Sequence, residues 1–156
     1  MNSIEQLMSE YPQLNYIYTR MPEGLPGLII DKTVYLKKDL TYQKEHETLA
    51  EEIGHYKTSV GDLTSLDNAV NRKQEKIARD WGRMKIITLD GLISCYKLCM
   101  RTAQEVADYF DVSVKYLFEA LEMYKRKFGV IYSYRGYTFI FDRGLILNKE
   151  SETIEN

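Results

Sequence analysis

One stretch of the chain, Leu49–His55 (LAEEIGH), constrains the fold more than any other. On an α-helix, residues four apart lie within about 40° of each other, so Glu51 and His55 share one face. Glu52 lies about 60° from His55 in azimuth and can reach the same point in space. Two side chains that can hold a metal, one turn apart and beside a further carboxylate, are the geometry of the zinc-protease pattern H-E-x-x-H. Here glutamate replaces the first histidine, which gives E-E-x-x-H.

The residues before this stretch predict a small sheet. Leu14–Thr19 is aromatic and β-branched, as strands are. Leu28–Ile30 and Thr33–Leu36 flank Asp31-Lys32, which predicts a hairpin although no glycine stands at its turn. We therefore expect an antiparallel sheet of about three strands, followed by helices, in an α+β fold.

Helical patterns run through the middle of the chain. Thr41 caps a helix that extends to about Lys57, with an apolar stripe of Leu49, Ile53 and Tyr56. Gly61-Asp62 breaks the chain, and a second long helix is predicted from about Asp67 to Met84. Its expected apolar face is formed by Val70, Ile77, Trp81 and Met84. A third helix starts at Thr88.

The C-terminal third is typical of a helix-turn-helix followed by a hairpin. Residues 102–128 predict two helices joined at Asp111-Val112-Ser113, with Ser113 as a cap. Val130–Tyr134 and Tyr137–Phe141, joined at Arg135-Gly136, predict an aromatic hairpin that covers the core or contacts a partner. The predicted division is a zincin-like core over 1–88, the helical region and hairpin over 89–148, and a frayed tail over 149–156.

A metal site needs a third ligand, and the second long helix offers Glu75 off its expected apolar stripe. Glu51, His55 and Glu75 would leave a fourth position open, as in catalytic zinc sites. Glu52 would then be the general base that takes a proton from water and passes it to the leaving amine. Gly54 would allow another backbone segment to approach the helix closely.

Two segments carry a resemblance to a known family. Thr48–Tyr56 (TLAEEIGHY) resembles the active-site helix of the ImmA/IrrE metallo-endopeptidases, and Asn71–Trp81 (NRKQEKIARDW) resembles their second helix, whose leading glutamate is the third zinc ligand. The resemblance continues from residue 102 to the closing hairpin. It implies a minimal zincin fold and a zinc metallo-endopeptidase of phages and mobile elements. Such enzymes act as anti-repressors that cleave a helix-turn-helix repressor.

Glu51 stands where the family has histidine, and this changes the expected metal chemistry. Two carboxylates and one imidazole give a centre about one charge less positive than the two-histidine site. We expect weaker zinc binding, with manganese or another divalent ion as the alternative, because carboxylate oxygen suits harder ions. His46 cannot replace the missing ligand, since nine residues place it about 180° from His55 around the helix and about 13 Å along it.

Composition and charge separate the remaining hypotheses. The formal net charge is −2, and 21 basic residues stand against 23 acidic ones, which disfavours a nucleic-acid partner. The segment 101–129 is itself neutral, so its helices are expected to pack on the core or to contact a repressor. We expect no signal peptide, no membrane span and two reduced cysteines, and hence a cytoplasmic protein. The competing hypothesis is an inactive zincin-like module that binds a repressor stoichiometrically.

Overall fold

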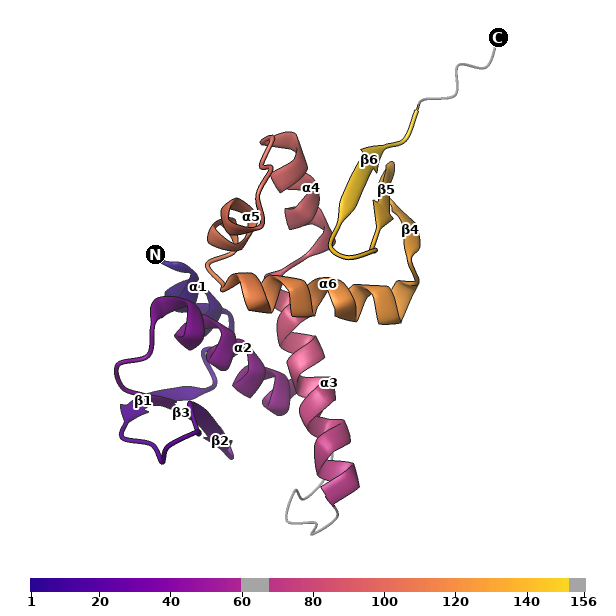
Figure 1. Cartoon of the computed structure of the whole chain (residues 1–156). Coiled ribbons are helices and arrows are strands. Elements are labelled where there is room, and N and C mark those ends of the chain that lie inside the picture. Colours follow the sequence, from indigo (N-terminus) through magenta and orange to yellow (C-terminus); the bar gives the residue numbers. More distant parts are fainter. Residues whose placement is uncertain (60–67, 152–156) are drawn as a thin grey trace.

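The computed structural model of the chain describes residues 1–59 and 68–151, which form an α+β fold. The predicted chain break at Gly61-Asp62 and the predicted helix start at Asp67 lie outside these residues. Figure 1 labels the elements. In chain order they are α1 (Ser3–Glu10), β1 (Asn15–Thr19), β2 (Gly27–Ile30), β3 (Thr33–Lys37), α2 (Tyr42–Thr58), α3 (Asn68–Ile86), α4 (Leu89–Lys97), α5 (Ala103–Tyr109), α6 (Val114–Phe128), β4 (Ile131–Tyr134), β5 (Tyr137–Ile140) and β6 (Ile146–Lys149).

The first sheet has the strand order β1-β3-β2. The antiparallel hairpin of β2 and β3 is confirmed, and Asp31 takes the left-handed conformation (φ 53°) that glycine usually supplies at such a turn. In contrast to the antiparallel prediction for the whole sheet, β1 pairs with β3 in parallel. The chain reverses between β1 and β2 and again between β2 and β3, so β1 and β3 run in the same direction. Because β3 lies between β1 and β2 in the sheet, β1 pairs with β3, and this pair is parallel.

Helix α2 covers this sheet, and the two share one apolar core. Thr41 caps the helix, as predicted, by accepting a hydrogen bond from the backbone N–H of Lys44. The helix packs its predicted stripe residues Leu49 and Ile53 against the central strand β3, where all solvent is excluded from them. The core therefore fixes which face of α2 points away from the sheet and toward α3.

Helices α2 and α3 cross at very short range through small residues. A Cβ atom added to Gly54 would lie 2.4 Å from the backbone oxygen of Ala78, and one added to Gly82 would lie 3.1 Å from the backbone of Ala50. The predicted close approach at Gly54 is thus confirmed, and the approaching segment is α3.

Among the described residues, the predicted apolar face of α3 was right only at Trp81, which is partly buried against the first apolar core. Ile77 and Met84 are 43% and 38% exposed, whereas Ala78 is fully buried and Gly82 is buried as well. The side chain of Val70 lies outside the described part of the structure. The face of α3 that meets α2 is chosen by how closely two backbones can approach. Bulky apolar side chains would prevent that approach, so hydrophobicity alone did not identify this face.

The C-terminal region forms a second apolar core. The predicted helix pair is confirmed as α5 and α6, with Ser113 as the N-cap of α6. Phe139 and Phe141 of the aromatic hairpin are almost fully buried against α6, which supports the core-cover interpretation of these strands. Strand β6 extends the hairpin to a three-stranded antiparallel sheet and was not predicted. Of the two free cysteines, Cys95 is buried and Cys99 is exposed.

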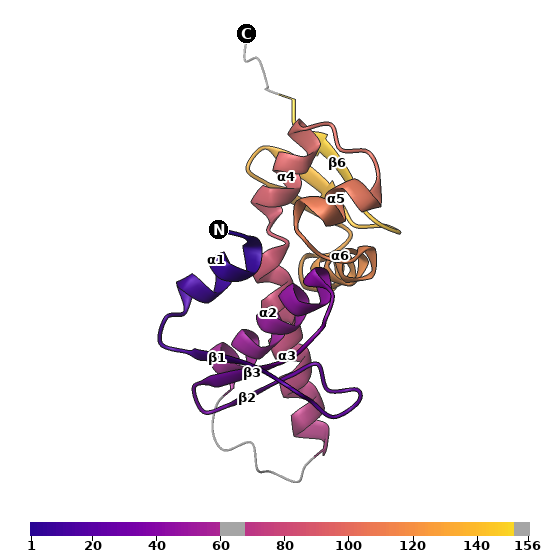
Figure 2. The same cartoon turned by 90° about the vertical axis from the view of Figure 1, so that its left-hand side faces the viewer.

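Helix α3 joins the two regions. It runs from the level of the first sheet up to the helices and second sheet of the C-terminal region. Helix α6 crosses its upper part in Figure 1 and lies beside that part, seen nearly end-on, in Figure 2. Arg83 of α3 makes ion pairs with Asp80, at 3.2 Å, and with Glu119 of α6, at 3.0 Å. A single helix therefore contacts both α2, which carries the candidate site, and α6.

We predict that Gly54→Ala destabilises the fold by about 1–3 kcal/mol, the usual cost of an overpacked interior. In an exposed helix the same change would add about 1 kcal/mol of stability through helix propensity. Urea denaturation of the purified protein measures the difference, with Gln43→Ala on the exposed first turn of α2 as the control. A Gly54→Ala variant as stable as the native chain would contradict the close α2–α3 crossing.

Candidate metal centre

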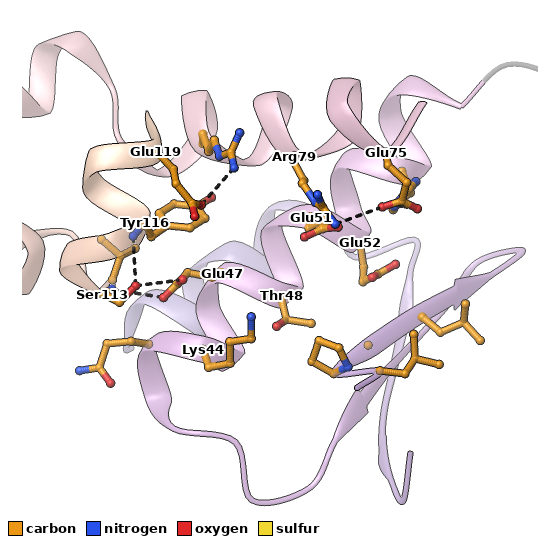
Figure 3. A pocket seen from close by; sticks show the side chains of 18 of the residues that line it. Lys44, Glu47, Thr48, Glu51, Glu52, Glu75, Arg79, Ser113, Tyr116 and Glu119 are labelled. Carbon is orange, nitrogen blue, oxygen red and sulfur yellow. Dashed lines mark hydrogen bonds and ion pairs between the residues drawn. The ribbon is translucent and has the colours of Figure 1, made fainter. Parts of the chain in front are cut away.

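The α2–α3 crossing brings three predicted metal ligands together. Glu51 and His55 lie one turn apart on α2. Glu75 lies on α3, on the side that faces Glu51 (Figure 3). The Nε2 atom of His55 lies 3.2 Å from Oε1 of Glu75. One ligand atom from each of the three residues lies within 4.8 Å of the other two. The sequence prediction that these three side chains converge is therefore confirmed.

The donor set fits a divalent cation. Two ligands of a tetrahedral ion with bonds of about 2.0 Å lie about 3.3 Å apart, close to the observed His55–Glu75 separation. One imidazole nitrogen and carboxylate oxygens from two residues are donors that zinc accepts, and the carboxylates also suit harder ions such as manganese. The side chain of His55 is only 12% exposed, while that of Glu75 is 45% exposed. The site is thus anchored inside and open on its outer side.

Arg79 is the member of this cluster that sequence reasoning missed. Its Nε lies 3.2 Å from Oε1 of Glu51, and its Nη2 lies 3.9 Å from Oε2 of Glu75. The available signal was its spacing, because an arginine four residues after a glutamate shares its helix face and pairs with it. The other carboxylate that Arg79 contacts, that of Glu51, belongs to α2, and only the fold brings it near.

Glu52, the predicted general base, is buried beside the three ligand residues. It is 8% exposed and faces β2 (Figure 3). Burial raises its pKa to about 8, and the nearby carboxylates of Glu51 and Glu75 add to this effect. A hydrogen bond from the backbone of Ile29 acts in the opposite direction. A carboxyl group whose pKa lies near neutral pH is suited to accept and then release a proton.

A cleft of about 1180 Å³ contains all of these groups. One wall is the loop before β2 together with β2 itself, and the floor is the face of α2 that carries the site. The far end is closed by the α5–α6 turn and the first two turns of α6, where Ser113, Tyr116 and Glu119 line the cleft (Figure 3). The candidate site therefore lies in a cleft that extends from β2, over α2, to the start of α6.

Side chains of α2 hold the α5–α6 turn at the end of this groove. Glu47 accepts hydrogen bonds from both the backbone N–H and the hydroxyl of Ser113, each at 3.2 Å. His46 is buried, and its Nδ1 lies 2.9 Å from the backbone oxygen of Asp111. The prediction that His46 cannot serve as a ligand of the site is confirmed, because its side chain is buried against the α5–α6 turn.

Comparisons with known proteins add no assignment: no protein-family model matches the chain, and no curated protein matches it significantly in sequence. Among the described helices, none combines the length and the apolar character needed to cross a membrane.

We predict that the chelator-stripped protein binds one Zn²⁺ ion and that binding raises its melting temperature, since a ligand that binds only the folded state stabilises it. His55→Ala and Glu75→Gln should each weaken binding by at least about ten-fold, because each removes a donor. Isothermal titration calorimetry measures the stoichiometry and affinity, and Glu45→Gln, on α2 but outside the cleft, is the control. Equal zinc affinity in His55→Ala and the native chain would rule out this site.

We also predict that Glu52→Gln stabilises the metal-free protein, by an amount that grows as the pH rises from about 5 to 8. The folded-state pKa of about 8 lies above the ordinary value of 4.5, so the folded protein binds the extra proton between these values. Native stability therefore falls across this range, whereas glutamine does not titrate. The difference should reach the order of a few kcal/mol and level off above pH 8. Denaturation in EDTA at several pH values measures it, and a pH-independent difference would contradict the raised pKa.

Proposed function

We propose that this protein is a metal-dependent endopeptidase, with zinc as the expected ion and manganese as the alternative. The convergence of Glu51, His55 and Glu75 beside a buried carboxyl in an elongated cleft is the observation that carries this proposal. A bound divalent ion would supply Lewis acidity toward a peptide carbonyl. The E-E-x-x-H helix followed by a glutamate helix also supports membership of the ImmA/IrrE family and a zincin-like fold, as the sequence resemblance implies.

In this proposal Glu52 handles the proton. Its carboxylate accepts a proton from the attacking water and donates it to the leaving amide nitrogen, so that one group serves both halves of the reaction. Burial against β2 holds this carboxyl at the cleft and raises its pKa toward the working pH. A positive charge bound nearby lowers that pKa and so increases the ionised fraction that acts as base.

Strand β2 is proposed to hold the substrate. It is an edge strand in the order β1-β3-β2, and its residues Leu28 and Ile29 line the cleft. An extended peptide that adds to this edge would gain main-chain hydrogen bonds over several residues. It would lie alongside the face of α2 that carries Glu51 and Glu52, because both walls belong to one groove.

The proposed substrate is a helix-turn-helix repressor of a phage or mobile element, which makes the protein an anti-repressor. The family resemblance supports this choice. The neutral charge of residues 101–129 supports a protein partner over DNA. In the alternative, a non-catalytic module that binds the repressor in fixed proportion, the same cleft would hold a segment of the repressor without cutting it.

Glu52→Gln separates these two functions. We predict that it lowers repressor cleavage by about 10²–10⁴-fold, the range for loss of a general base, while repressor binding is retained. Cleavage is followed by gel electrophoresis and mass spectrometry of the products, and binding by pull-down. Glu45→Gln is the matched control on the same helix outside the cleft. Full biological activity of Glu52→Gln would support the stoichiometric binder.

A further inference from the structure

Arg79 is a cation that contacts two of the three candidate metal ligands, Glu51 and Glu75. It stands on α3 one turn after Glu75, and its guanidinium lies against Glu51 on the opposite helix (Figure 3). Its side chain is 54% exposed, so it is not held in place by burial. The positive charge of a third residue thus lies beside the same two carboxylates that would hold a metal.

The charges of the cluster explain why this contact forms. Glu51 and Glu75 place ligand oxygens within 4.8 Å of each other across the helix crossing, and like charges at this distance repel. A guanidinium between them offsets that repulsion in the metal-free protein. Arg79 also contributes one positive charge, which equals the difference between a glutamate and a neutral imidazole at position 51. Glu51 and Arg79 together therefore carry the same net charge as a histidine ligand.

We propose that Arg79 is an internal counter-ion of the site, which balances its carboxylates when no metal is present and lowers the affinity for a divalent cation. This inference rests on the metal site of the proposed function and adds how that site is regulated. A cation that enters meets a positive charge already paired with Glu51, so metal uptake is an exchange of one cation for another. The exposed, flexible side chain of Arg79 can turn toward solvent as this happens.

The test is a zinc titration of full-length, chelator-stripped protein against a chromophoric competitor. We expect Arg79→Gln to bind Zn²⁺ about ten-fold more tightly, the size that follows from removing a unit charge beside a divalent ion in largely solvated surroundings. Arg79→Lys keeps the charge and should stay near native affinity. Lys76→Gln, an exposed change on the same helix outside the cleft, should leave affinity unchanged.

A second measurement, of stability in EDTA, addresses the metal-free state. Here Arg79→Gln should melt at a lower temperature than the native chain, because the repulsion between Glu51 and Glu75 is no longer offset. Added Zn²⁺ should remove this deficit, because the ion then balances the carboxylates. A purely structural role for Arg79 predicts a lower melting temperature together with weaker metal binding, which is the opposite affinity change.

The possible results separate this inference from the proposed function. If the native chain binds zinc and Arg79→Gln binds it equally well or more weakly, the counter-ion role is overturned and the metal site stands. If only Arg79→Gln binds, the counter-ion role is supported, and metal-dependent catalysis by the native chain is overturned. If neither protein binds Zn²⁺, or Mn²⁺ in the same titration, both are overturned.

Discussion

The close crossing of α2 and α3 is the contact on which the candidate site depends. Gly54 and Ala78 allow the two backbones to approach closely, and Gly82 repeats the arrangement against Ala50. Only at this separation can His55, projecting from one helix, meet Glu75 from the other at 3.2 Å. A bulkier residue at the crossing would separate the helices, and the ligand atoms would move apart with them. The packing of small residues thus sets the geometry of the polar cluster.

That geometry has an electrostatic cost, which the structure offsets in two ways. Three carboxyl groups lie close together, and Glu52 is largely buried, which disfavours its charge. In the absence of a metal, protonation relieves Glu52, as its raised pKa indicates, and Arg79 pairs with Glu51. The free energy of such a site therefore depends on pH and on cations, whereas the apolar core beneath it depends on neither. Function and stability are coupled through these few side chains.

Sequence reasoning succeeded where the cause is local. The cap at Thr41, the face shared by Glu51 and His55, and the Arg135-Gly136 turn each follow from residues close together in the chain. It failed where the cause is long-range. The parallel pairing of β1 depends on β3 lying between two strands that precede it, which no local pattern specifies. The pairing of Arg79 with Glu51 likewise requires the helix crossing.

The face of α3 shows a different limit. Hydrophobicity favoured Ile77 and Met84, yet the buried face is the one that carries Ala78 and Gly82. The expected position of Glu75, off the apolar stripe, nevertheless proved useful. Glu75 lies three residues before Ala78, so it projects from the side of α3 that meets α2. A metal ligand three residues before a small residue on one helix is a better guide to this site than the apolar stripe. The ligand can reach the other helix only if the small residue lets the two helices pack closely.

Helix α2, which carries the site, also anchors the segment that closes the far end of the cleft. Glu47 lies one turn before Glu51 on α2, and its two hydrogen bonds to Ser113 hold the N-terminus of α6 against that helix. A carboxylate at a helix N-terminus is favoured by the exposed N–H groups there. Because α2 is continuous from Tyr42 to Thr58, the distance between this anchor and the ligand residues is fixed by helix geometry. Helix α2 therefore sets the distance between the closed end of the cleft and the candidate metal ligands that it carries.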